Sequence, residues 1–257
     1  MAKVMGILNV TPDSFYPASR VQDADSLAAR VEQICSEGAC CIDIGACSTR
    51  PGAPLAPAPE ERERLEWSLP IIRQHNAGRC LLSIDTFRTD VARWCIREHT
   101  IDIVNDVSGG TDEMFRLVAQ TGVQYVLTSA LEVAPGTDIV TGTCAFFEER
   151  LQRMARLGVS VDSQVIIDPG FGFGKTLDEN WTLLSGMASL KSFGLPILAG
   201  LSRKSMAWKL LGISPDECLP ATTAMNMAAL ERGAAWLRVH DVRPAVETAR
   251  LFAKLEA

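Results

Sequence analysis

The feature that most constrains the fold is a regular alternation of short apolar segments with longer amphipathic ones. Apolar, β-branched runs that alternate with helical segments are typical of parallel strands buried on both faces. Eight such runs occur, and they are Val4–Val10, Cys40–Ala46, Leu81–Thr86, Ile103–Val107, Gln124–Ser129, Val165–Pro169, Pro196–Leu201 and Trp236–His240. Eight βα units in 257 residues match the size of a (β/α)8 barrel.

We therefore predict an α/β protein with one (β/α)8 barrel domain over residues 1–257. Helices are expected at Ala24–Glu37, Glu60–Gln74, Thr89–His99, Met114–Thr121, Phe146–Leu157, Thr222–Arg232 and Arg243–Leu255. Length alone also allows two domains, but the proline-rich stretch Pro51–Pro59 is typical of a semi-rigid loop within one domain. The alternative fold is a doubly wound open sheet, which usually carries a glycine-rich phosphate loop after its first strand. Here that strand ends in Asn9-Val10-Thr11-Pro12, which is no such loop.

Composition excludes several classes of function. The formal net charge is −6 and no basic cluster occurs, so a nucleic-acid partner is not expected. No apolar run approaches the roughly 18 residues of a membrane span, and residues 1–10 lack the order of a signal peptide. The eight cysteines form no CxxC pair and no zinc spacing. We therefore expect a reduced, cytoplasmic chain.

Polar residues gather where the expected strands end. This set comprises Asn9, Asp43, Asp85, Asn105, Asp106, Asp168, Lys204, Arg238 and His240. In a (β/α)8 barrel the C-terminal rim of the strands carries the active site. Any single Asp or Asn here would equally well cap a helix or begin a turn, and for Asp43 and Asp106 that alternative stays open. Several together favour a ligand site, because buried carboxylates need charged or hydrogen-bonding partners.

The residue types at this rim indicate what the ligand is. Asp85, Asn105 and Asp168 supply acceptors and one amide, which suit a flat heterocycle rich in N–H groups, such as a 2-amino-4-oxo pyrimidine ring. Lys204 and Arg238 suit a ring oxygen or an anionic group. No HExxH, clustered Cys/His set, GxSxG or P-loop is present, so a protein-bound transition metal is not expected. Mg²⁺ shared with substrate phosphates stays open, because it commonly takes only one or two protein ligands.

Seven segments in order along the chain resemble the dihydropteroate synthase family. They are Met5–Phe15, Ser48-Thr49-Arg50-Pro51-Gly52, Ser83-Ile84-Asp85-Thr86, Asn105-Asp106-Val107-Ser108, Asp168–Lys175, Ser202-Arg203-Lys204-Ser205 and Arg238-Val239-His240-Asp241-Val242. Each motif alone is weakly specific, but the ordered set spans almost the whole chain and is highly specific.

The resemblance implies condensation of 6-hydroxymethyl-7,8-dihydropterin diphosphate with 4-aminobenzoate, assisted by Mg²⁺, in a homodimer that sulfonamides would target. It implies a pterin pocket of Asp85, Asn105, Asp168 and Lys204, and an aminobenzoate pocket of Thr49, Pro51, Phe173 and Ser205. It implies a diphosphate site of Asn9, Arg50, Arg238 and His240, with Asn9 as the metal ligand. The catalytic set would be Asp85, Asp168, Lys204 and Arg238.

The chain departs from the family pattern at three places. Phe15 is followed by Tyr16–Arg20 where the family usually has an Asp-Gly-Gly type sequence, and Ala46-Cys47 replaces a Gly-Glu pair. After the fifth strand, Thr128-Ser129-Ala130 replaces the usual Met-His-Met. The last departure motivates an alternative function, a pterin-binding relative with lost or altered activity, such as a methyltransferase-like module. A non-catalytic binding protein has no positive feature in its favour.

Overall fold

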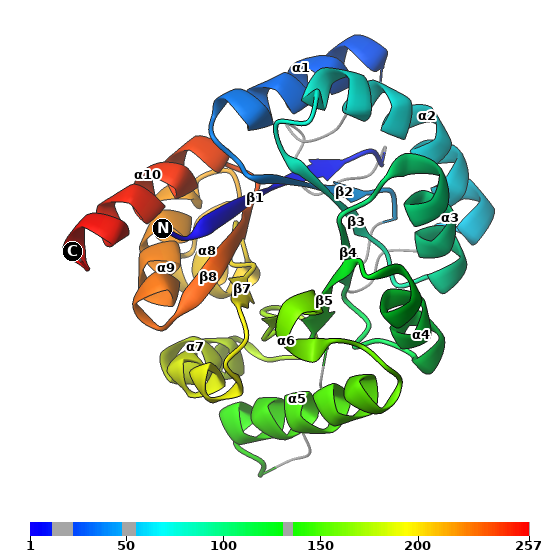
Figure 1. Cartoon of the computed structure of the whole chain (residues 1–257). Helices are drawn as coiled ribbons and strands as arrows, with labels where there is room; N and C mark the ends of the chain where they lie inside the picture. The colour runs from blue at the N-terminus through cyan, green and yellow to red at the C-terminus, as the bar shows by residue number, and fades with distance from the viewer. Residues whose placement is uncertain (12–22, 48–54, 131–135, 257) are drawn as a thin grey trace.

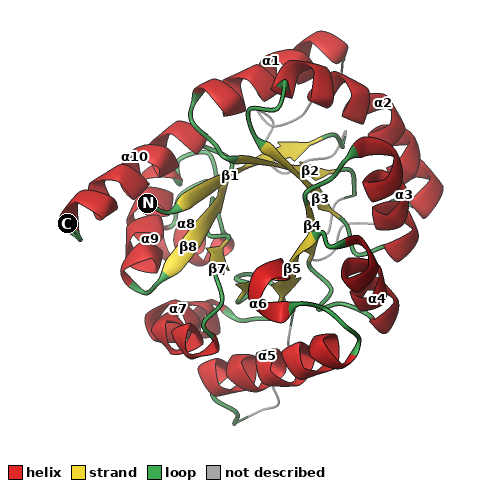
Figure 2. Cartoon of the chain, viewed as in Figure 1, coloured by secondary structure: helices red, strands yellow, loops and turns green. Residues whose placement is uncertain are grey.

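Eight parallel strands close into a barrel surrounded by helices (Figures 1 and 2). The computed structural model describes residues 1–11, 23–47, 55–130 and 136–256. The strands follow one another around the barrel in sequence order, and β1 closes the circle by pairing with β8. The predicted α/β class and single (β/α)8 barrel are therefore confirmed.

The strands lie within or close to the predicted runs. They are β1 (Lys3–Asn9), β2 (Cys41–Gly45), β3 (Leu81–Asp85), β4 (Ile103–Asp106), β5 (Gln124–Thr128), β6 (Val165–Asp168), β7 (Ile197–Ala199) and β8 (Ala234–Val239). The helices are α1 (Ala24–Ser36), α2 (Ala58–Asn76), α3 (Thr89–His99), α4 (Asp112–Thr121), α5 (Ile139–Arg156), α6 (Val161–Gln164), α7 (Leu177–Gly186), the 3-10 helix η2 (Met187–Phe193), α8 (Ser205–Leu211), α9 (Leu219–Glu231) and α10 (Val242–Leu255). None of these described helices has the length and apolarity that a membrane crossing requires.

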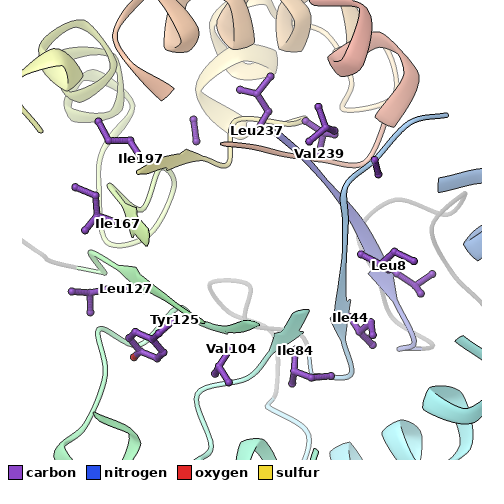
Figure 3. Close-up of a cluster of buried hydrophobic side chains, with 14 of the residues drawn as sticks. Leu8, Ile44, Ile84, Val104, Tyr125, Leu127, Ile167, Ile197, Leu237 and Val239 are labelled. Carbon is purple, nitrogen blue, oxygen red and sulfur yellow. The ribbon is translucent and has the colours of Figure 1, made fainter. Parts of the chain in front are cut away.

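Alternation along each strand divides the apolar residues into two cores. Leu8, Ile44, Val104, Tyr125 and Leu237 are among the side chains that point away from the barrel axis and pack against the helices (Figure 3). A second cluster fills the barrel interior, and it consists of Met5, Cys41, Ile103, Val126, Ile166, Leu198 and Trp236. Successive strand residues face opposite sides of a sheet, so the interior positions of these strands can be counted from this second cluster. Those of β3 follow from its register with β2.

The interior filling changes from apolar to polar toward the C-terminal ends of the strands. Two residues beyond Cys41 on β2 lies Asp43, two beyond Ile103 lies Asn105, and two beyond Ile166 lies Asp168. The barrel interior is therefore a packed apolar core toward the N-terminal ends of the strands, while its C-terminal mouth is lined by charged and amide groups. This is the end at which (β/α)8 enzymes bind their substrates.

Candidate active site at the C-terminal mouth of the barrel

None of the predicted strand-end acids caps a helix. The N-cap positions of the described α-helices, α1 to α10, are Asp23, Pro57, Arg88, Thr111, Asp138, Ser160, Thr176, Lys204, Cys218 and Asp241. Asp85, Asn105 and Asp168 instead occupy interior positions at the C-terminal ends of β3, β4 and β6, beyond the apolar layer. Capping therefore does not account for these residues, and the ligand-site interpretation is favoured.

Asp106 differs from these residues in the side of the sheet that it faces. Its neighbour Val104 packs outside the barrel, so Asp106 also faces outward. Its carboxylate accepts hydrogen bonds from the Ser108 backbone N–H at 2.8 Å and from the Tyr125 hydroxyl at 2.8 Å. Asp106 thus stabilises the turn after β4, as the structural alternative in the sequence suggested.

Arg238 joins two buried carboxylates across the mouth. Its Nε donates to Asp43 Oδ2 and its Nη2 to Asp85 Oδ2, each at 2.6 Å. The two negative charges raise the pKa of Arg238 despite its burial, which by itself would lower it. The guanidinium therefore stays charged and holds β2, β3 and β8 together at the site.

Asp43 is a site residue whose role the sequence left open. It is fully buried and accepts hydrogen bonds from Ser83 Oγ at 2.6 Å and from Asn105 Nδ2 at 3.0 Å, in addition to Arg238. Because its amide nitrogen is bound to Asp43, Asn105 is held with its carbonyl oxygen away from that carboxylate. The alternation of Cys41, Asp43 and Gly45 along β2 is the sequence signal that places Asp43 in the interior.

Two acceptor atoms at this site lack partners. Asp85 Oδ1 and Asn105 Oδ1 are buried, and no described residue donates a hydrogen bond to either of them. Buried acceptors are normally paired, because an unpaired one carries its full desolvation penalty. Two such atoms on neighbouring strands, in register with each other, indicate a ligand that brings N–H donors.

Asp168 and Lys204 form the other side of the mouth. Asp168 Oδ1 accepts from the Gly170 backbone N–H at 2.8 Å. Burial lowers the pKa of Lys204 to about 8, with Arg238 acting in the same direction and Asp168 and Asp85 opposing it. Lys204 Nζ lies 4.6 Å from the centroid of the Phe173 ring, so an aromatic face and a cation adjoin each other here.

Burial also perturbs the carboxyl groups of the pocket. It raises the pKa of Asp85 to about 7, although the nearby Arg238 lowers it, and it raises the pKa of Asp168. Strongly perturbed groups that converge in one place are typical of functional sites.

Asn9 ends β1, and His240 directly follows the neighbouring strand β8, so both lie at the rim. A Cβ atom at Gly45 would lie 3.1 Å from Asn9 Oδ1 and 3.8 Å from Asp85 Oδ2, so glycine at position 45 leaves room between these groups. Burial, together with Arg238 and Arg203, lowers the pKa of His240 to about 3. His240 therefore acts as a neutral imidazole, and its Nδ1 lies 3.0 Å from Ser202 Oγ.

The loop that carries Lys204 is held by a buried ion pair. Arg203, which has a left-handed backbone conformation with φ of 54°, binds both carboxylate oxygens of Asp241 and donates to the Pro215 carbonyl. Ser205 is the first residue of α8.

Thr49, Arg50 and Pro51 lie outside the described residues, so their predicted roles stay predictions.

Comparison with known proteins agrees with this geometry. Residues 5–240 match the family model described as pterin binding enzyme. A dihydropteroate synthase of Streptococcus pyogenes is 37% identical over 99% of this chain and 96% of its own length. The chain belongs to the dihydropteroate synthase family. The Escherichia coli synthase is 34% identical over 96% of this chain and 89% of its own length.

Solved structures of dihydropteroate synthases share the whole architecture. The Clostridium difficile synthase, solved in the presence of pteroic acid, has a TM-score of 0.91 and 31% identity, with 99% of this chain and 96% of that one covered. The Xanthomonas albilineans synthase, solved with 4-aminobenzoic acid, has a TM-score of 0.87 and 34% identity, with 100% and 93% covered. The resemblance seen in the sequence is therefore confirmed.

Proposed function

We propose that the protein is a dihydropteroate synthase of folate biosynthesis, a transferase that joins 6-hydroxymethyl-7,8-dihydropterin diphosphate to 4-aminobenzoate. The observation that carries this proposal is the pair of buried, unpartnered acceptors, Asp85 Oδ1 and Asn105 Oδ1, beside the cations Arg238 and Lys204. The acceptors suit the N–H groups of a pterin ring, and the cations suit its oxygen and the diphosphate. The related Clostridium and Xanthomonas structures, solved with pteroic acid and with 4-aminobenzoic acid, support both substrates.

The reaction replaces one bond at the pterin methylene carbon. The C–O bond to diphosphate breaks, the amine nitrogen of 4-aminobenzoate forms the new C–N bond, and that nitrogen then releases a proton. The electron-rich dihydropterin supports positive charge on the methylene carbon as diphosphate leaves. The amine is already neutral, so the site needs no strong general base, in keeping with a neutral His240. Positioning and electrostatic stabilisation then supply most of the rate.

Each part of the site has a proposed role in this scheme. Asp85, Asn105, Asp168 and Lys204 bind and orient the pterin, while Arg238 and His240 bind the departing diphosphate. Phe173 and Ser205 line the aminobenzoate side together with Thr49 and Pro51, and Arg50 joins the diphosphate side, as the family resemblance implies. A sulfonamide drug is bound in the structure of the Yersinia pestis synthase, which is 33% identical, and we propose that sulfonamides compete for the same aminobenzoate position here.

A Mg²⁺ ion would be bound by the substrate more than by the protein. Among the described residues there is no group of three His, Cys, Asp or Glu side chains that could hold a metal ion. Asn9 Oδ1 is a neutral oxygen ligand of the kind that Mg²⁺ accepts, and diphosphate oxygens and waters would complete its octahedron. When bound, the ion would neutralise charge on the leaving diphosphate.

Activity is tested by incubating the purified protein with the pterin diphosphate, 4-aminobenzoate and Mg²⁺ and measuring dihydropteroate. We expect product, and we expect EDTA to abolish its formation while binding of pteroic acid, which lacks the diphosphate, persists. Pterin binding without any product would instead favour the second candidate, a pterin-binding relative with altered activity. The replacement of Met-His-Met by Thr128-Ser129-Ala130 is the observation that keeps this candidate open.

The assembly and location of the protein are proposals as well. We propose a homodimer, as the family resemblance implies, and the exposed Leu210 and Leu211 at the end of α8 supply an apolar surface for it. We also propose a cytoplasmic location, in keeping with the free thiols of Cys35, Cys40, Cys41, Cys80, Cys95, Cys144 and Cys218.

A further inference from the structure

Thr128, the last residue of β5, faces the active site. Along β5, the side chains of Tyr125 and Leu127 point away from the barrel axis (Figure 3), whereas Val126 lies in the interior cluster. By alternation Thr128 therefore points inward. It is in register with Asp168 on β6, and residues paired across parallel strands carry their side chains on the same face. The Thr128 side chain thus lies beside a carboxylate of the pterin pocket.

The hydroxyl of Thr128 has no partner among the described residues. Thr128 is fully buried, and its Oγ1 makes no hydrogen bond within the described part of the chain. Its methyl group, Cγ2, lies 3.2 Å from where a Cβ of Gly170 would stand, so that side of Thr128 packs against the turn after β6. A buried hydroxyl without a partner lowers stability, and such groups in a site are normally completed by a ligand or water.

Neighbouring groups show the same incomplete pairing. Asp85 Oδ1 and Asn105 Oδ1 also lack partners within the described residues, and both belong to the same mouth. Asp168 Oδ1, in contrast, is already bound by the Gly170 N–H. The unpartnered groups thus include two acceptors and one hydroxyl, which can donate as well as accept.

We propose that Thr128 is a specificity-determining residue whose hydroxyl hydrogen-bonds a polar ring atom of the bound pterin, next to the atoms held by Asp168. The inference rests on the proposed function, because it takes a pterin as the ligand. Thr128 stands where the family usually has a methionine. In this chain a directional hydrogen bond from the Thr128 hydroxyl would replace an apolar contact between that methionine and the ring. The pocket would then discriminate against rings that carry carbon at that position, because the hydroxyl would stay unpaired.

The test compares Thr128→Val, which keeps the shape and removes the hydroxyl, with Thr128→Ser, which keeps the hydroxyl. Each protein is titrated calorimetrically with 6-hydroxymethyl-7,8-dihydropterin diphosphate and Mg²⁺ in the absence of 4-aminobenzoate. Loss of one hydrogen bond is expected to weaken binding by about three- to tenfold in T128V, whereas T128S should bind like the wild type. The KM for 4-aminobenzoate should not change in either variant.

Thr143→Val is the matched control. Thr143 is equally buried, but it lies in α5 and its hydroxyl already donates to the Ile139 carbonyl at 2.7 Å. T143V should therefore lower the melting temperature and leave pterin affinity unchanged. T128V should keep or raise the melting temperature of the ligand-free protein, because it removes a hydroxyl that lacks a partner there.

The outcomes separate this inference from the proposed function. Equal or tighter pterin binding by T128V would overturn the role of Thr128, whatever the activity of the enzyme. Wild-type protein that binds the pterin diphosphate but forms no product with 4-aminobenzoate would overturn the synthase proposal, while the comparison of T128V with wild type would still decide the inference. Wild-type protein that does not bind the pterin would overturn both.

Discussion

A single buried carboxylate, Asp43, orients the site through three hydrogen bonds. It accepts from Ser83, Asn105 and Arg238, all within 3.0 Å. An asparagine at position 43 has one acceptor oxygen, and its amide would face a donor. We expect Asp43→Asn to lower the free energy of unfolding by about 2 kcal/mol, the range for hydrogen bonds to a charged group, as measured by urea denaturation.

The same substitution should impair pterin binding more than stability alone predicts. Asp43→Asn releases the Asn105 amide, whose carbonyl oxygen is one of the unpartnered acceptors. We expect the KM for the pterin diphosphate to rise at least about tenfold, since one tenfold change corresponds to about 1.4 kcal/mol. Ser83→Ala, which removes one donor to Asp43 and leaves Asn105 in place, is the control. Similar KM values in the two variants would contradict the orienting role.

The pH dependence of the activity should reflect the titration of two site residues, Asp85 on the acid side and Lys204 on the alkaline side. Burial raises the pKa of Asp85 to about 7 and lowers the pKa of Lys204 to about 8. Below pH 7 Asp85 takes up a proton and loses an acceptor for the pterin ring, whereas above pH 8 Lys204 loses its charge. We expect kcat/KM to pass through a maximum between about pH 7 and 8, because this ratio reports the ionisations of the free enzyme.

Lys204→Arg separates the two limbs of that profile. A guanidinium stays protonated over the whole range, so the fall of kcat/KM above pH 8 should disappear, whatever the absolute rate. The fall below pH 7 should remain, because Asp85 is unchanged. An alkaline limb that persists in the variant would assign it to another group.

At the scale of elements, the turn after β6 depends on glycine for space as well as for conformation. Gly170 and Gly122 both have φ of +73°. A Cβ at Gly170 would lie 2.0 Å from the Ser129 carbonyl oxygen, whereas a Cβ at Gly122 would meet nothing within 4 Å. The two positions thus separate backbone strain from steric overlap.

We expect Gly122→Ala to lower the free energy of unfolding by about 1–2 kcal/mol, the cost of a left-handed conformation. Gly170→Ala should lower it by about 2–5 kcal/mol, because overpacking adds to that strain, and it should abolish pterin binding by displacing Asp168. Chemical denaturation and calorimetric titration measure both effects. Equal losses of stability in the two variants would contradict this expectation, because they would show that overlap of the new Cβ with the Ser129 carbonyl oxygen adds no cost.

Helices and strands could be predicted from the sequence where apolar residues recur at regular spacing. The eight strands follow from apolar runs bounded by turns, and both ends of helix α3, Thr89 and His99, were predicted correctly. Helix α5 begins at Ile139, seven residues before the predicted Phe146, because Asp138 caps it by accepting from the Thr141 N–H. Helix α7 was not predicted, although the capping box of Thr176 and Glu179 marks its start.

At the scale of the whole molecule, sequence order predicted which strand ends meet, but it did not predict which side chains pair. Asp85, Asn105 and Asp168 were expected at one mouth, and they lie there. The pairing of Arg238 with Asp43 depends on the register and tilt of β8 against its neighbours, which no local pattern encodes. The hydrogen-bond partners of Asp43 could therefore be identified only from the structure of the closed barrel.

Closure of the barrel also constrains how two copies can associate. The β1–β8 pairing leaves no free edge in the sheet of the described strands, so we expect a dimer to form through helices or loops. Helix α8 ends with Leu210 and Leu211, which are 65% and 56% exposed, and it contacts α7, whose first residue Leu177 is also exposed. This combined surface of α7 and α8 is where we place the proposed dimer contact.

We expect the wild-type protein to sediment at twice the chain mass of 27.9 kDa at micromolar concentration. The double substitution Leu210→Glu and Leu211→Glu should produce monomers, because burying two unpaired carboxylates costs more than the contact supplies. Leu251→Glu is the control, since Leu251 is 64% exposed on a different helix, α10, and it should leave the dimer intact. Sedimentation equilibrium measures all three. A monomeric wild type would refute the dimer itself, whereas a dimeric double variant would move the contact to another face.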